Sequence, residues 1–258
     1  GIDDPIHVQY PKWAWQYLQG NWGVSYTSRA DVRDYVLSRL PVTLGIVGSA
    51  YVVGILIAIP VGVISALKQY SVFDQIATTF AFLGFSLPTF FTGILLIVLF
   101  SVKLGWLPFI YDVNATGFWP NVKQSIMPIA VLGLAGSASL TRFVRASVLE
   151  VIGQDYVRTA RAKGLRERSV IIGHALRNAM IPVVTIIAIQ IPEIFGGAII
   201  TEQIFRIPGI GSLLISGIYE KDVPTVMAVA FGISILVVVF NIVADILYAV
   251  LDPRIKYS

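Results

Sequence analysis

Few residues of this chain have the types and spacings that covalent chemistry needs. The two histidines, His7 and His174, stand apart, and neither begins the H-E-x-x-H pattern that holds zinc on a helix. Ser86 lies in Gly-Phe-Ser-Leu-Pro, which lacks the second glycine of a nucleophile elbow, and Pro88 indicates a kinked helix instead. No Gly-Lys pair exists for a phosphate-binding loop, and no cysteine is present. The sequence therefore predicts no catalytic residue, no metal site and no cofactor within this chain.

The densest charge lies in residues 142–177, which carry eight Lys or Arg and three Asp or Glu side chains. Within it, residues 154–177 read as two helical stretches separated by Gly164. Their apolar side chains must be shielded from water. Three contacts that could do so stay open: the chain's own membrane domain, anionic lipid, or a groove on a separate protein. These side chains are Tyr156, Val157, Ala160, Leu165, Val170, Ile171 and Ile172.

The rest of the chain is apolar enough to meet lipid. Its 258 residues are 56% hydrophobic and only 13% charged, whereas soluble domains have about 25% charged residues. A helix needs about 20 apolar residues to cross a bilayer. Five stretches satisfy this requirement: 40–67, 75–102, 124–141, 178–200 and 223–244. We therefore predict an all-α, polytopic membrane protein with one membrane domain over residues 39–252.

The distribution of Lys and Arg predicts how these spans are oriented. Positively charged loops stay in the cytoplasm, so residues 142–177 and the tail 253–258 are expected there. Residues 1–38 then form an external segment that holds three of the five tryptophans. The segment is not a signal peptide, because it begins with acidic residues rather than a basic start and an apolar run. The excess of positive charge, +4 for the whole chain, is thus explained by the Lys and Arg that orient the spans in the membrane. No nucleic acid partner is expected.

Several motifs, in one order along the chain, resemble a known transporter family. DYVRTARAKGL at 155–165 and HALRNA at 174–179 resemble the cytoplasmic loop of peptide-type ABC importer permeases. These form the dipeptide and oligopeptide branch of the binding-protein-dependent transport family. Three shorter segments resemble the same branch: LGWLP at 104–108, IPGIG at 207–211 and DPRI at 252–255. The likeness runs from about Gly20 to the C-terminus.

The resemblance implies a type I ABC importer transmembrane domain with defined partners. These are a second homologous permease subunit, two cytosolic ATPase subunits that bind ATP and Mg, and an extracytoplasmic substrate-binding protein. The location implied is a bacterial or archaeal cytoplasmic membrane. Because family members usually begin with one further span, five spans are expected in this chain and six in the complete protein.

In such a domain the basic loop 142–177 is the coupling element that docks on the ATPase, with Gly164 as its turn. The wider superfamily has Glu-Ala-Ala six to four residues before this glycine. Here Arg158, Thr159 and Ala160 stand in those places, so the glutamate is absent. The residues to which the resemblance gives this role are Asp155, Tyr156, Arg158, Thr159, Ala160, Arg161, Ala162, Lys163, Gly164, Leu165, His174, Arg177 and Asn178.

Two carboxylates lie inside apolar stretches, where ionisable groups are rare and often functional. Glu193 follows Pro192 and precedes two glycines, which predicts an interrupted helix lining a cavity of the translocation path. Two roles stay open for Glu193, pairing with a peptide's free amine or with a structural partner. Asp245 lies seven residues before Asp252, about 10 Å along a helix, so it is expected near the inner interface or paired within the bundle.

The function predicted from these observations is that of a permease subunit for peptides or similar small solutes. It forms the translocation path and couples it to ATP hydrolysis on a separate subunit, so it is not itself an enzyme. A secondary transporter or channel without ATP coupling is the alternative, since it would also place charges beside broken helices. That class predicts inverted repeats, which the sequence does not show. An intramembrane enzyme would need a catalytic pair, and none was found.

Overall fold

The chain folds as an assembly of helices. The computed structural model describes residues 5–251, without the side chains of residues 191–197, 244 and 247–251. In that part no strand is found beyond one isolated bridge between Val24 and Asp31, so the predicted all-α class is confirmed. In chain order the helices are α1 (Ile6–Leu18), α2 (Val32–Leu67), α3 (Val72–Ser86), α4 (Thr89–Leu96), the π-helix η1 (Ile97–Lys103), α5 (Phe118–Ile152), α6 (Asp155–Ala162), α7 (Glu167–Ser169), the π-helix η2 (Val170–Leu176), α8 (Arg177–Phe205), α9 (Ile210–Tyr219) and α10 (Val223–Leu251).

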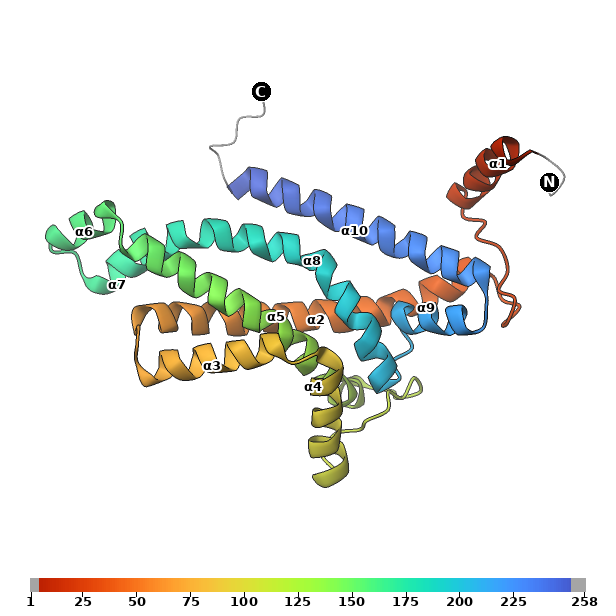
Figure 1. The fold of residues 1–258 in the computed structure, drawn as a ribbon, viewed down its shortest axis with the longest axis horizontal. Helices are drawn as coiled ribbons and strands as arrows, with labels where there is room; N and C mark the ends of the chain where they lie inside the picture. Colours follow the sequence, from red (N-terminus) through yellow and green to blue (C-terminus); the bar gives the residue numbers. More distant parts are fainter. Residues whose placement is uncertain (1–4, 252–258) are drawn as a thin grey trace.

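The long helices α2, α5, α8 and α10 run alongside one another and form the body of the molecule (Figure 1). We call the end with α6, α7 and the α2–α3 turn the loop end. The opposite end, with α1, residues 19–31 and the α9–α10 turn, is called the far end. The basic segment predicted to be cytoplasmic thus has α6 and α7 at one end of the helices, and residues 19–31 of the segment predicted to be external lie at the other (Figure 1).

Between four and six segments of the described residues are long and apolar enough to cross a membrane. Four are single helices, within α2, α5, the α7–η2–α8 run and α10. Two more are bent pairs, α3 with α4–η1 at 107° and the end of α8 with α9 at 79°. The first three predicted spans each fall within one of these segments. The fourth, 178–200, begins in the Glu167–Gln190 segment and ends in the bent pair that closes α8, and the fifth, 223–244, matches Val223–Val243 except for its last residue.

The second predicted span, 75–102, is not one straight helix. It breaks between α3 and α4, where Leu87 has an extended backbone with ψ of 125°. Pro88 explains the break, because it has no N–H to donate and its ring disfavours a helical residue before it. The kink that Pro88 predicted is present, and the stretch forms two helices bent by 107° instead of one straight helix.

The third predicted span also has different bounds. It was expected to end at Thr141, before the first arginine of the basic segment, but α5 continues to Ile152. Arg142 stays in the helix because its guanidinium lies 4.4 Å from the ring centre of Phe82 on α3. The connection between α5 and α6 is correspondingly short. At the other boundary, residues 32–38, expected to be external, form the first turns of α2, which Asp31 caps by accepting from the N–H of Arg33.

Helices α2 and α5 form the most extensive helix contact of the fold. Their backbones approach closely because glycines face the partner helix. A Cβ built on Gly62 would stand 2.7 Å from the Cβ of Val144, and one on Gly133 would stand 3.0 Å from the carbonyl oxygen of Ala50. Small residues at such crossings are typical of helix pairs in membranes, where dispersion contacts replace the hydrophobic effect.

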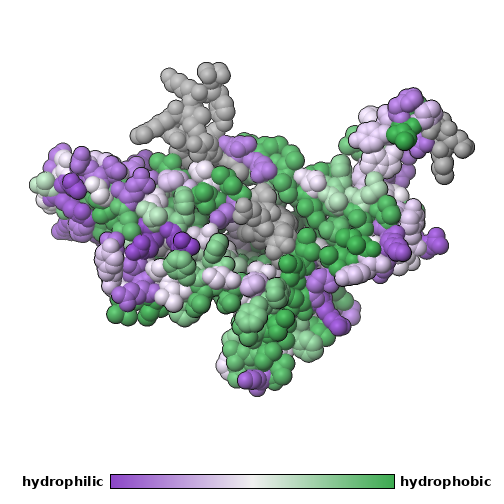
Figure 2. Space-filling view, viewed as in Figure 1, coloured by the Kyte–Doolittle hydropathy of each residue, from purple (hydrophilic) through white to green (hydrophobic). Residues whose placement is uncertain are grey.

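Much of the outer surface is apolar. Figure 2 shows hydrophobic side chains over the helix body and over the arm formed by α4 and η1, which projects from it. Phe90, Ile94, Val98 and Val102 of this arm are 47%, 49%, 42% and 71% exposed. An exposed apolar area of this kind marks contact with lipid or another protein rather than with water.

Candidate coupling loop and translocation path

The segment after α5 forms a short helix and a tight turn. Helix α6 begins after Gln154, and Asp155 in its first turn complements the helix dipole. After α6 ends at Ala162, the backbone turns at Gly164, whose φ is +74° and whose N–H donates to the carbonyl of Arg161 at 2.9 Å. Glycine adopts this left-handed conformation without the steric cost that a Cβ brings. The turn expected at Gly164 is therefore present.

The apolar side chains of this segment divide between two environments. Val157 and Ala160 of α6 are buried against Val170 and Ala175 of η2. The two helical stretches therefore shield each other, and Val151 and Ile152 at the end of α5 pack against them. Three others remain open to solvent, since Tyr156, Leu165 and Ile172 are 43%, 44% and 53% exposed.

The second helical stretch differs from the prediction. Instead of a separate loop helix, α7 has three residues and η2 continues directly into α8, with Leu176 in helical conformation at the junction. The stretch thus forms the first turns of the next span. Across the turn, Arg161 Nη2 lies 2.8 Å from Glu167 Oε1, which joins α6 to the start of this run.

The predicted coupling residues lie together on the loop end, and all except Ala160 are exposed. Thr159 Oγ1 donates to the carbonyl of Asp155 at 2.9 Å. The carbonyl of His174 accepts from Asn178 Nδ2 at 2.8 Å. The exposed members are Asp155, Tyr156, Arg158, Thr159, Arg161, Ala162, Lys163, Gly164, Leu165, His174, Arg177 and Asn178.

The structure tests only the backbone part of the prediction for Glu193. Its side chain lies outside the described residues, so no partner is assigned to it. The helix interruption expected around it is absent, because α8 is helical from Arg177 to Phe205, although it changes direction along its length (Figure 1). Asp245, the other intramembrane acid, is exposed on α10.

A cavity of about 390 Å³ opens beside the break between α3 and α4. It is lined by α2, α5 and α8 as well as by the two ends of the broken helix. The polar side chains on its wall are those of Tyr51, Thr89, Ser139 and Gln190. The sequence predicted the kink at Pro88 but not the cavity, which depends on how four distant segments meet.

A buried ion pair at the loop end was missed by the sequence analysis. Arg145 of α5 donates to both carboxylate oxygens of Asp74 on α3, at 2.7 and 2.8 Å. Asp74 lies just before the second predicted span and Arg145 just after the third. Both were interpreted as loop charges, because a hydropathy window detects the charge and not its partner.

A second missed carboxylate, Glu202, is buried where α8, α9 and α2 meet. Thr43 Oγ1 donates to it at 2.6 Å, and the backbone N–H of Ser212 donates at 2.8 Å. A Cβ on Gly209 would stand 2.1 Å from Glu202 Oε1, and one on Gly211 would stand 2.7 Å from the Cα of Ile199. The glycines of the 207–211 motif therefore leave the space in which this carboxylate receives the start of α9.

A third carboxylate, Asp222, ties the external segment to the α9–α10 turn. Ser25 Oγ donates to it at 2.5 Å, the N–H of Tyr26 at 3.1 Å and Thr225 Oγ1 at 2.8 Å. Burial alone would raise the pKa of Asp222. The hydrogen bonds that it accepts, of which the bond from Ser25 contributes most, hold the pKa below its usual value. The carboxylate is therefore charged at neutral pH.

Aromatic rings extend this attachment toward α1. Tyr17 is buried against Trp22 and against Phe231 of α10, with ring centres 5.8 and 5.1 Å apart. Burial raises the pKa of the Tyr17 phenol to about 12. Farther along α1, Tyr10 and Trp15 are 65% and 64% exposed, so the segment presents aromatic surface at the far end.

Comparison with known proteins places this arrangement in a family. A model described as "binding-protein-dependent transport system inner membrane component" matches residues 58–257. The chain belongs to this family. It is therefore a multi-pass membrane permease of the ABC importer class, in which permeases work with ATPase and binding-protein partners.

Individual members of the binding-protein-dependent transport family resemble it over its full length. The oligopeptide transport permease AppB of Bacillus subtilis is 41% identical, over all of this chain and 83% of its own. The dipeptide permease DppB of Escherichia coli is 39% identical, with coverage of 100% and 83%. The glutathione permease GsiC of Salmonella typhi is 38% identical, over 100% of this chain and 82% of its own.

Solved structures of importers share the fold. An amino acid ABC transporter aligns with a TM-score of 0.65 at 13% identity, over 83% of this chain and 93% of its own. The methionine transporter MetNI, in an inward-facing conformation, aligns with a TM-score of 0.64 at 18% identity, over 84% of this chain and 96% of its own. At these identities the likeness concerns the fold alone, and it agrees with the predicted ABC importer transmembrane domain.

Proposed function

We propose that this chain is the permease subunit of an importer for peptides or closely related small solutes. The observation that carries the proposal is the similarity of 38–41% over the whole chain to permeases named for oligopeptides, dipeptides and glutathione. These cargoes share peptide amides with free ends. The cavity at the α3–α4 break fits such cargo in character, since hydroxyl and amide groups interrupt an apolar wall.

The proposed assembly contains a second homologous permease, two ATPase subunits with ATP and Mg, and an extracytoplasmic binding protein. In this assembly the loop end faces the cytoplasm of a bacterial or archaeal cell, as its excess of Lys and Arg favours. The domain bounds proposed are an external segment over residues 1–38, a membrane domain over 39–252 and a tail over 253–258.

The coupling loop is assigned to α6 and the turn at Gly164. Its exposed residues combine apolar contact surface, from Tyr156 and Leu165, with cationic side chains such as Arg158 and Lys163. Tyr156 and Arg158 suit a groove on a protein partner, because aromatic and arginine side chains are enriched at protein interfaces. The external segment with its exposed aromatic rings is assigned to the binding protein, and Glu193 to the translocation path.

Reconstitution of the complete transporter tests this function. The chain would be co-expressed with its partner permease, ATPases and binding protein, and placed in liposomes that contain ATP on the ATPase side. We expect ATP-dependent accumulation of labelled dipeptides and tripeptides, and none when the chain is omitted or when a non-hydrolysable ATP analogue is used. Accumulation driven by an ion gradient without ATPase subunits would refute the proposal in favour of a secondary transporter.

A further inference from the structure

The loop-end part of α5 is attached to two other spans within six residues. Arg142 lies over the ring of Phe82 on α3, at 4.4 Å from its centre. The hydroxyl of Ser147 donates to the carbonyl of Ala179 on α8 at 2.7 Å. This part of α5 therefore cannot move without displacing its neighbours, and the strongest of its attachments is the ion pair between Arg145 and Asp74.

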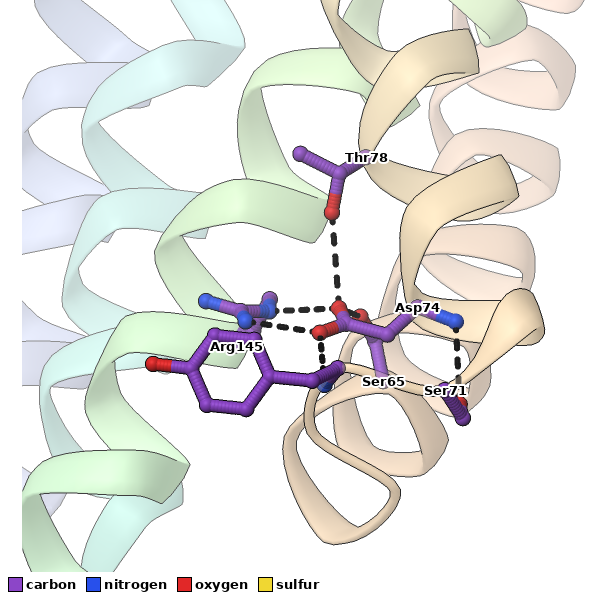
Figure 3. Close-up of polar contacts among 6 residues, drawn as sticks. Ser65, Ser71, Asp74, Thr78 and Arg145 are labelled. Carbon is purple, nitrogen blue, oxygen red and sulfur yellow. Dashed lines mark hydrogen bonds and ion pairs between the residues drawn. The ribbon is translucent and has the colours of Figure 1, made fainter.

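Asp74 accepts hydrogen bonds from α5, from α2, from the α2–α3 turn and from its own helix α3, where Thr78 Oγ1 donates at 3.4 Å (Figure 3). Besides the two bonds from Arg145, it accepts from the N–H of Tyr70 in the α2–α3 turn at 2.9 Å and from the hydroxyl of Ser65 on α2. Its own N–H donates to Ser71, the residue that caps α3. The side chains of Asp74 and Arg145 are only 5% and 26% exposed. Paired, hydrogen-bonded contacts of this geometry are stronger and more directional than neutral hydrogen bonds.

The ion pair lies on the path from the coupling loop into the bundle. Arg145 precedes Ile152, the last residue of α5, by seven residues, or about 10 Å along the helix. Ile152 and Val151 pack against the cluster that holds Val157 of α6 in place. A displacement of α6 therefore reaches both η2, against which it mainly packs, and the last two turns of α5, which also carry Arg145.

On the other side of the ion pair, α3 leads to the cavity. Helix α3 packs mainly against α2 and α5 and runs from Asp74 to the break at Pro88. Near its end, Gly84 and Phe85 line the cavity. The close contact at Gly84, where a Cβ would stand 3.0 Å from the Cβ of Ala138, keeps α3 and α5 together there as well.

From this continuity we infer that the ion pair between Arg145 and Asp74 is the joint that passes movement of the coupling loop to α3. Through α3 the movement reaches the cavity wall beside the α3–α4 break. Both residues act by positioning helices and do not touch the cargo. The inference rests on the proposed function, because it presupposes an ATPase that moves α6. If the pair had a purely structural role, its loss would impair assembly of the transporter. It would not change the amount of cargo transported per ATP hydrolysed.

The first test measures that ratio in the reconstituted transporter with labelled trialanine. For Asp74→Asn and Arg145→Gln we expect ATP hydrolysis to continue and uptake per ATP to fall about five-fold or more, the lower end of typical coupling effects. Exchanging the charges, with Asp74→Arg and Arg145→Asp in one chain, should restore part of this loss. Ser125→Ala is the matched control, because Ser125 hydrogen-bonds only within α5 at the other end, to the carbonyl of Asn121. Unchanged uptake per ATP in both single variants would overturn the inference.

If the single variants fail to assemble, Arg145→Lys keeps the charge but loses the paired geometry. A transporter with Arg145→Lys that assembles and still keeps the full ratio would likewise overturn the inference, and a lowered ratio would support it.

The second test does not depend on the cargo, so it separates failure of the joint from failure of the proposed function. The chain has no cysteine, so spin labels can be placed on cysteines introduced at Ser86 at the end of α3 and at Val239, which is exposed on α10. Helix α10 packs mainly against α8 and α9 and serves as the reference for movement of α3. In the complete complex we expect the distance between the labels to shift when ATP binds, and the shift to be lost with Asp74→Asn but kept with Ser125→Ala. A shift that persists in Asp74→Asn would refute the joint even if peptides prove not to be the cargo.

Discussion

The turn at Gly164 allows the coupling assignment to be tested by a substitution whose cost is confined to the backbone. No atom lies within 4 Å of the position that a Cβ would take on Gly164, so alanine meets no clash there. What remains is the left-handed conformation at φ of +74°, which costs a residue with a Cβ about 1–2 kcal/mol. That energy corresponds to a factor of roughly 5–30 in the population of the native turn.

This cost should appear in ATPase binding. Helix α6 has eight residues, fewer than the roughly 12–15 that an isolated helix needs for stability in water. Its position therefore depends on the turn and on the packing of Val157 and Ala160. When only a fraction of molecules is competent to bind, the apparent affinity falls by that fraction. For Gly164→Ala we expect weaker ATPase binding by up to roughly 5–30-fold, with normal membrane insertion.

The measurement is titration of the detergent-purified permease pair with ATPase subunits, followed by transport in liposomes. Gly173→Ala is the matched control, because Gly173 lies in the same segment with no left-handed backbone and nothing within 4 Å of its Cβ position. ATPase binding by Gly164→Ala equal to that of the unmodified chain would refute the argument, as would an equal loss in both variants. Gly164→Val should lose at least as much, since its branched Cβ adds crowding.

Two further predictions concern the packing of α2 and the attachment of the external segment. Gly62→Ala should cost about 1–3 kcal/mol more than Gly48→Ala, because only the first meets Val144. Its melting temperature in detergent should be lower by roughly 2–4 °C per kcal/mol, and equal melting temperatures would contradict the packing argument. The pKa of Asp222 is lower in the folded protein than its usual value of 3.8. The charged carboxylate therefore stabilises the fold fully at pH values above 3.8, and this stabilisation is lost as the pH falls through the lower pKa of the folded state. Asp222→Asn should therefore expose residues 19–31 to protease at pH 7, as acid does in the unmodified chain, whereas equal protection at pH 7 would argue against this attachment.

The positions and order of the apolar stretches could be predicted because crossing a bilayer demands such stretches, which a single sequence displays directly. Their number as crossings lies between four and six, since two of them are bent pairs. The turn at Gly164 was predictable for a similar reason, since one glycine between two helical stretches is a local signal. Boundaries were less accurate. α5 passes Arg142 and Arg145 because α3 supplies an aromatic ring and a carboxylate for them, and neither partner is visible in the sequence around α5.

The carboxylates that organise the fold illustrate the same limit. Asp74 and Arg145 are 71 residues apart, Thr43 and Glu202 are 159 apart, and Ser25 and Asp222 are 197 apart. Sequence periodicity reports on neighbours within a helix, so contacts at these separations leave no local pattern. The IPGIG motif contains the nearest local signal, since glycines allow a close approach of backbone to another group. From the sequence alone, this motif was used only as a mark of family resemblance.

The three carboxylates differ in how readily their contacts can be exchanged. The contacts described for Glu202 and Asp222 come from hydroxyl and backbone N–H groups, and water can replace such neutral donors when a segment opens. Asp74 is held by a guanidinium, and its own side chain is only 5% exposed. Removing one partner of a buried ion pair costs about 3–5 kcal/mol, because the remaining charge is left without compensation. We therefore expect the far end to open at lower cost, while α3 and α5 stay joined at the loop end. A permease driven from its cytoplasmic side needs this asymmetry, because force applied to α6 must move the helices before it breaks the contact through which it is transmitted.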